Sequence, residues 1–150
     1  MRRFFFGLAA LFGLGAAGVA ATRVLGSEPE VEGVANPLPA CPGVPNCARA
    51  SRAFAIDADT LRRVAEASVR ADRGLWTGRA DEISLTEGGL RAIYRVGPFA
   101  DDLATEVTPG AEGHSILHLR SASRTGRSDL GVNRARINRI VADVQARLGA

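Results

Sequence analysis

The sequence predicts an α+β domain in which two helices pack on about four antiparallel strands, preceded by a hydrophobic leader or anchor helix. Two segments carry apolar residues at helical spacing, and four segments between them alternate apolar and polar residues as half-buried strands do. Short turns that contain Gly or Pro separate these strands, which favours antiparallel hairpins. A chain of 150 residues accommodates one such domain.

The first 26 residues have the composition of a signal peptide or a membrane anchor. Arg2 and Arg3 precede residues 4–22, which carry no charge and nearly reach the length that crosses a hydrocarbon layer of about 30 Å. Small residues over 16–21 suit cleavage, whereas an uncleaved stretch would contact the membrane. Because arginines before an apolar stretch stay inside, we expect the rest of the chain to be exported to the cell envelope, on the periplasmic side, secreted or anchored.

Residues 27–40 are acidic, contain prolines and show no periodicity, which predicts a linker. A short loop between Cys41 and Cys47 follows, and its prolines and glycine favour a turn. In an oxidising compartment we expect these cysteines to form a disulfide that stabilises the fold by roughly 2 kcal/mol.

A zinc site built from the two cysteines with His114 and His118 is the weaker alternative, because the cysteine loop lies far from the histidines in sequence. The spacing of the cysteines also differs from the redox and haem motifs. We therefore expect no metal and no cofactor.

All 19 basic residues are arginine, so a Walker A loop, a Schiff-base lysine and a lysine general base are excluded. Residues 120–150 hold seven arginines against two acids, but the acidic middle of the chain offsets this excess. Nucleic-acid binders are basic over a broad face, and we expect no nucleic-acid partner here.

The first helix is expected over residues 58–71, with Asp57 as its N-cap. Trp76 follows a turn at Gly74 and is expected to anchor the core. Strands are expected over residues 83–86, 90–96, 103–107 and 115–120.

His118 alternates with Leu117 and Leu119, so it faces the other side of its strand, where we expect it to be solvated or bonded locally. The last helix is expected after Ser128 and Asp129, either of which can cap it, and to run to the C-terminus with one apolar stripe.

Three segments resemble the signatures of the DUF1499 family: CPGVPNC at 41–47, FADD at 99–102 and RSASRTGRSDLGVNRARI at 120–137. The similarity spans roughly residues 41–148, and members are small proteins, often exported or membrane-anchored, with no established biochemical function. The resemblance implies a domain over residues 41–150 and supplies no activity. Members tend to continue the first segment with Val-Ser-Ser, whereas this chain continues with Ala, Arg, Ala and Ser51.

The polar run from Arg120 to Arg136 allows two interpretations. In the structural one, Asp101, Asp102 and Asp129 pair with arginines of the run and tie the last strand and helix together. In the functional one, arginine side chains and N–H groups at the helix start bind an anion such as a carboxylate, a phosphate or a lipid headgroup. The tentative anion-site residues are Arg120, Ser121, Ser123, Arg124, Ser128, Asp129, Asn133, Arg134, Asp101 and Asp102.

We therefore expect a non-catalytic binding or structural module of the cell envelope, with no catalytic residue assigned. One alternative is a small envelope hydrolase with Asp101 or Asp102 as base and Ser121 or Ser123 as nucleophile, although adjacent carboxylates on a strand point apart. Another is a subunit that docks an envelope protein partner.

Overall fold

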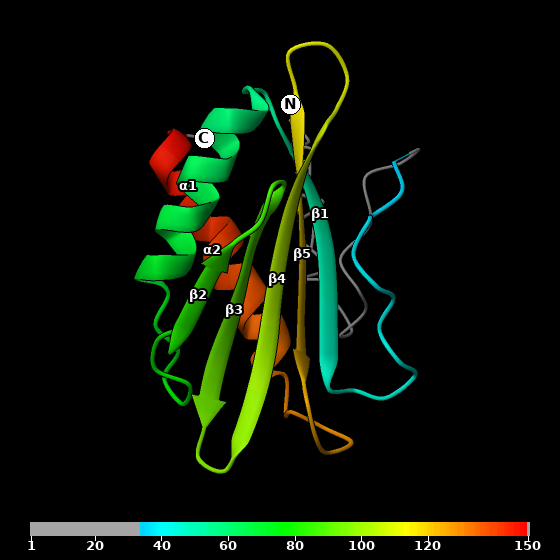
Figure 1. Cartoon of the computed structure of the whole chain (residues 1–150), viewed down its shortest axis with the longest axis vertical. Coiled ribbons are helices and arrows are strands. Elements are labelled where there is room, and N and C mark those ends of the chain that lie inside the picture. The colour runs from blue at the N-terminus through cyan, green and yellow to red at the C-terminus, as the bar shows by residue number, and fades with distance from the viewer. Residues whose placement is uncertain (1–33, 150) are drawn as a thin grey trace, which may run out of the picture.

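The structure is a computed structural model that describes residues 34–149, so the leader expected over residues 1–26 lies outside the described residues. Its centre is an antiparallel sheet with the strand order β1-β5-β4-β3-β2 (Figure 1). The elements follow one another as β1 (Cys47–Phe54), α1 (Ala58–Ala71), β2 (Glu82–Leu85), β3 (Gly89–Val96), β4 (Phe99–Pro109), β5 (Ser115–Ser123) and α2 (Val132–Leu148). The α+β class and the two helices are confirmed.

The expected number of about four strands is wrong, because the sheet has five. The strand that was missed is β1, which pairs with β5 from Cys47 opposite Ala122 to Phe54 opposite Ser115. Its sequence alternates alanine with Arg49 and Ser51 and contains no β-branched residue, so it lacks the composition typical of a strand. Ala48 and Ala50 are buried on the helix side, where Ala50 and the α2 residues Ile137 and Val141 line one hollow.

The helix α1 has the bounds and the cap that were expected. The Asp57 carboxylate accepts a hydrogen bond from the Thr60 backbone N–H at 2.8 Å, and this bond holds the pKa of Asp57 below its usual value. The buried side chains of α1, Leu61, Ala65 and Val69, recur at helical spacing. Neither described helix has the length and apolar character needed to cross a bilayer.

Both helices cover the same face of the sheet, and in Figure 1 the strands lie in front of α2. The core lies between them. The side chains that the sheet contributes to this core lie in rows across neighbouring strands. In one row, Ala92 of β3 lies opposite Leu103 of β4, which lies opposite Ser121 of β5. The residues of this core that come from α2 are Ile137, Ile140, Val141 and Val144.

The expectation that Trp76 anchors the core is wrong, since 79% of its surface is exposed. Residues 72–81 connect α1 to β2, and Gly74 and Gly78 exchange two backbone hydrogen bonds of 2.9 and 3.1 Å. These bonds close a loop that carries Leu75 and Trp76 at its tip, away from the sheet. A tight local turn therefore places a large apolar side chain in solvent.

The end of the expected linker belongs to the folded body. Leu38 is buried, and the Asn36 side chain donates to Ser51 Oγ at 3.0 Å, while Arg49 donates to the Asn36 carbonyl at 2.7 Å. Residues 36–38 therefore pack on the side of β1 that faces away from the helices.

Candidate functional site

A buried arginine lies at the centre of the polar run. Arg136 is in the second turn of α2 and is completely buried, yet its guanidinium forms an ion pair with Asp101 of β4 at 2.8 Å. A second guanidinium nitrogen donates to Ser121 Oγ and to Asn133 Oδ1, each at 2.8 Å. The ring of Tyr94 lies 4.0 Å from the guanidinium carbon. Charge, hydrogen bonds and an aromatic face thus stabilise this cation together.

The hydroxyl groups that face α2 complete the network. Ser121 donates to Asn133 Oδ1 at 2.6 Å, and Ser123 donates to Asp101 at 2.6 Å. The Asn133 amide donates in turn to Ser123 Oγ at 3.0 Å and to Asp129 at 2.7 Å. Nearly every polar atom in this cluster therefore has a partner, as buried polar atoms require.

The start of α2 is capped by the protein itself. The Asp129 carboxylate accepts hydrogen bonds from the backbone N–H groups of Gly131 at 2.9 Å and Asn133 at 2.8 Å. These N–H groups are the ones an external anion would need at a helix N-terminus. Asp129 accepts backbone N–H groups as expected, although the N-cap residue of α2 is Gly131, and the Asp129 carboxylate takes the place of such an anion.

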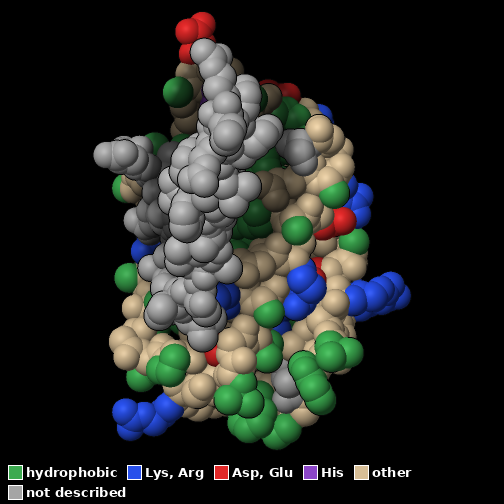
Figure 2. Space-filling model, turned by 180° about the vertical axis from the view of Figure 1, so that it is seen from behind, with side chains coloured by type: hydrophobic (Ala, Val, Ile, Leu, Met, Phe, Trp, Pro, Cys, Tyr) green, Lys and Arg blue, Asp and Glu red, His purple; other side chains and the backbone are tan. Residues whose placement is uncertain are grey.

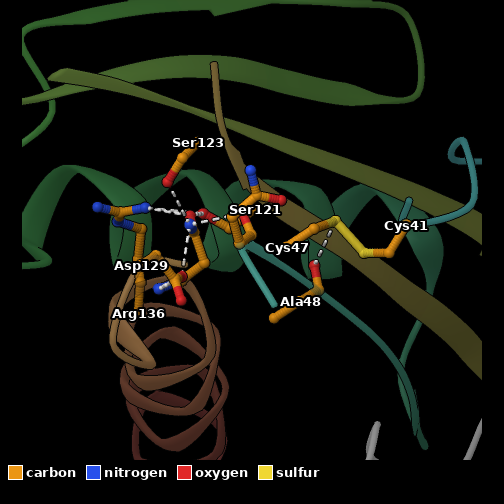
Figure 3. Close-up of a disulfide and its surroundings, with 9 residues drawn as sticks. Cys41, Cys47, Ala48, Ser121, Ser123, Asp129 and Arg136 are labelled. Carbon is orange, nitrogen blue, oxygen red and sulfur yellow. Dashed lines mark hydrogen bonds between the residues drawn. A yellow bond between two sulfur atoms is a disulfide. The ribbon is translucent and has the colours of Figure 1, made fainter. Parts of the chain in front are cut away.

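The disulfide loop is joined to this cluster (Figure 3). Cys41 and Cys47 are bonded, which confirms the expected disulfide. Between them, Asn46 is buried; its side chain donates to the Gly126 carbonyl at 2.7 Å, and its own carbonyl accepts from the Asn133 amide at 3.2 Å. All three segments that resemble the family signatures therefore meet around Arg136 and Asn133.

The other aspartate of the pair faces away from the helices. Asp102 and Arg124 form a bidentate ion pair, with bonds of 2.8 to 3.2 Å, in which both side chains are half-exposed. The hydrogen bonds from Arg124 to Asp102 raise the pKa of the Arg124 guanidinium. The expectation that adjacent carboxylates point apart agrees with this arrangement.

Beside that ion pair, a hollow of about 470 Å³ lies on the face of the sheet that points away from the helices, which we call the open face. Arg91 of β3 and Arg120 of β5 lie on either side of Ala104 of β4 in one cross-strand row. Both arginines line the hollow, and within residues 34–149 neither guanidinium has an ion-pair or hydrogen-bond partner. Ile93 supplies part of the apolar wall.

The ten residues that were expected to form an anion site therefore do not form one cluster. Arg120, Arg124 and Asp102 lie on the open face of the sheet, while Ser121, Ser123, Asp101, Asp129 and Asn133 surround Arg136 under α2. Ser128 is exposed, with its hydroxyl accepting from the Leu130 N–H at 3.3 Å, and Arg134 is half-buried on α2. The structural interpretation holds for Asp101 and Asp102, whereas Asp129 bonds to N–H groups and not to an arginine.

His118 is bonded locally, as one of the two expectations for it stated, but it is fully buried and not solvated. Its Nδ1 lies 2.8 Å from Ser51 Oγ, and its Nε2 lies 2.8 Å from Thr108 Oγ1. A serine beside a histidine is the usual nucleophile–base contact of hydrolases. Here Ser51 is also fully buried, and the histidine's second nitrogen meets a hydroxyl in place of a carboxylate, so the network ties β1, β5 and β4 together.

The structure also bears on the alternatives. The thiols of Cys41 and Cys47 are consumed by the disulfide, and no group of three or more potential metal ligands occurs in the described part of the chain. For hydrolysis, Ser121 and Asp101 are buried under α2, and Asp102 lies on the opposite face. Ser123, the other serine considered, is half-buried and donates to Asp101 at 2.6 Å, so this pair belongs to the Arg136 cluster.

Sequence reasoning missed Arg91, Tyr94 and Ser51. Arg91 is one polar residue in an alternating strand, and its importance comes from its register opposite Ala104. Ser51 lies on the strand that was not expected. A signal for Tyr94 existed, since it is the single tyrosine of the chain and alternates with apolar residues on β3.

Comparison with known proteins gives one match. A sequence model described as "Protein of unknown function (DUF1499)" matches residues 37–144. No match was found among the curated proteins or among the solved structures. The matched region contains all five strands and most of α2, and the chain therefore belongs to the DUF1499 family.

Proposed function

We propose that this chain is a non-catalytic module of the cell envelope that binds an anionic group in the hollow between Arg91 and Arg120. The uncharged stretch over residues 4–22 and the disulfide support an envelope location, because disulfides persist in oxidising compartments. The Arg136 cluster supports a structural role for most of the polar run.

The observation that carries the proposal is a pair of guanidinium groups without partners across a small side chain. Arg91 and Arg120 are two strands apart, about 10 Å between their Cα atoms at ordinary strand spacing. Ala104 between them leaves room above the sheet. Two guanidinium groups that converge over such a space can each donate two hydrogen bonds to a carboxylate or phosphate.

The surrounding charges favour this position over the start of α2. Asp102 is neutralised by Arg124, and Glu82 by Arg95 at 2.9 Å, so the rim of the hollow holds ion pairs that are already satisfied. By contrast, the N–H groups at the start of α2 bond to Asp129. Of the residues that were expected to form an anion site, Arg120 is the one that the proposal retains as a direct ligand.

Calorimetric titration of the full chain with inorganic phosphate and with citrate tests the proposal and separates the two anion types. We expect Arg91→Gln and Arg120→Gln each to weaken binding about tenfold, since one charged hydrogen bond contributes about 1.5 kcal/mol or more. Arg63→Gln, on the exposed side of α1, is the matched control and keeps parental affinity. Equal affinity in all three variants, or no binding by the parent, would refute the hollow as an anion site.

The location has its own test. In intact cells, Cys41 and Cys47 should resist alkylation by maleimide until a reductant is added, and the chain should fractionate with the envelope. A reduced chain in the cytosol would contradict the envelope proposal without bearing on the hollow.

A further inference from the structure

Three connections lie at one end of the sheet, which we call the loop end: residues 72–81, the turn at 97–98 and residues 124–131. The register fixes this arrangement. The first residues of β2 pair near the last residues of β3, and the first residues of β4 pair with the last residues of β5. In Figure 1 the three connections lie in the lower half of the molecule.

The loop end carries most of the exposed large apolar side chains in residues 34–149. Five such side chains are exposed, and four of them lie here or at its border: Leu75 at 90%, Trp76 at 79%, Phe99 at 53% and Leu130 at 94%. The fifth, Leu85, lies at the other end of β2. Figure 2 shows hydrophobic side chains gathered along the same lower edge of the molecule. Such a cluster marks an interaction surface.

The tip that carries Leu75 and Trp76 is held in place by its surroundings. Gly74 and Gly78 join its two ends, and just before it Asp72 forms a bidentate ion pair with Arg139 of α2, with bonds of 2.8 and 3.2 Å. A side chain on Gly74 would collide with Thr77 and Arg139. The tip is therefore presented in a fixed shape, which lowers the entropy lost on contact with a partner.

The charges at the loop end complement a negative surface. Arg73, Arg79 and Arg127 are exposed, and no partner for them occurs among the described residues. Every acidic residue there is engaged, and these residues are Asp72, Asp81, Glu82, Asp101, Asp102 and Asp129. Asp81 and Asp129 accept only uncharged N–H groups, so the charges without an ion-pair partner at this end are three arginines against two aspartates.

We propose that the loop end docks on an anionic lipid bilayer, with Leu75, Trp76 and Leu130 entering the interface and the three arginines on the headgroups. Tryptophan suits this position because its ring is apolar and its N–H is polar, and each arginine near an anionic leaflet adds electrostatic attraction. This inference rests on the proposed envelope location, since it needs a membrane nearby, and it is independent of the anion hollow. A protein partner is the competing occupant.

Trp76 is the single tryptophan of the chain, so its fluorescence reports on this tip alone. The full chain is reconstituted into vesicles of zwitterionic lipid with or without anionic phosphatidylglycerol, with bromine on the acyl chains. We expect brominated acyl chains to quench Trp76 in the anionic vesicles, together with a blue-shifted emission. Emission typical of a solvent-exposed indole, quenched by aqueous acrylamide but not by the brominated chains, would overturn the proposal in favour of a protein partner.

Two variants keep the result specific. The double variant Trp76→Phe with Leu85→Trp moves the tryptophan to the other end of β2, and quenching by the brominated chains should then be abolished. Persistent quenching would show that the reconstituted chain contacts lipid without a preferred end. Arg73→Gln with Arg79→Gln should reduce quenching in anionic vesicles, while the control Arg63→Gln with Arg147→Gln removes equal charge elsewhere and should not. Failure here with normal phosphate or citrate titrations would reject the docking surface and leave the hollow standing.

Discussion

Replacing Arg136 with methionine tests whether the buried cluster stabilises the fold. The substitution keeps a long apolar side chain and removes the cation, so Asp101, which is 3% exposed, is left with Ser123 as its hydrogen-bond donor. Breaking a buried ion pair by removing one partner costs about 3–5 kcal/mol.

We therefore expect Arg136→Met to lower the free energy of unfolding by about 4 kcal/mol. Urea unfolding of the full chain at pH 7, followed by far-ultraviolet circular dichroism, measures this loss.

Arg124→Gln is the matched control, because Arg124 pairs with the neighbouring aspartate on the open face. Both members of that pair are half-exposed and screened by solvent, so its loss should cost much less than the loss of the buried pair. Similar losses for Arg124→Gln and Arg136→Met would refute the assignment of the buried pair as the stabilising one.

Three further predictions concern titration and cross-linking. Burial, reinforced by the nearby Asp72 carboxylate, raises the pKa of Tyr94, so the free energy of unfolding should fall as pH rises above about 10, where tyrosine ionises in the unfolded chain. Tyr94→Phe should remove that fall, and absorbance at 295 nm should show that this tyrosine, the single one in the chain, ionises at a higher pH than usual. Because the pKa of Asp57 is lowered in the folded protein, its carboxylate stabilises the fold above about pH 4, and this stabilisation is lost as pH falls through the folded-state pKa. The difference in stability between Asp57→Ala and the parent, measured by thermal unfolding, should therefore become smaller in acid. Replacing Cys41 and Cys47 by serine should cost roughly 2 kcal/mol in urea unfolding without changing the circular dichroism spectrum, and an unchanged midpoint would contradict a stabilising role.

Local signals in the sequence were sufficient for α1 but not for β1. The cap at Asp57 and the apolar residues that follow it lie within one short segment, so the bounds of α1 could be predicted closely. Strand β1 depends on β5, far along the chain, and its alanines suit a place where α2 packs closely. Small residues predict a strand only weakly, because whether they suit a strand depends on what packs against them.

The candidate site shows the same division. The expectation that the carboxylates of Asp101 and Asp102 pair with arginines of the polar run was sound, but their partners depend on which face of β4 each occupies and on the register with β5. A cation near a helix start is unfavourable by itself, and the Asp101 carboxylate beside Arg136 offsets this, which the sequence does not reveal. For Trp76, hydrophobicity alone favoured the core, and only the closed turn at Gly74 and Gly78 explains its exposure.

The pairing of the first strand with the last has a consequence for biogenesis. On the proposed envelope location, residues 47–54 cross the membrane well before residues 115–123, which are their neighbours in the described sheet. The disulfide can close early, but the strand beside it waits for nearly the whole polypeptide to arrive. Until then this segment has unpaired backbone groups, so under the same proposal we expect slow translocation to lower the yield of native protein.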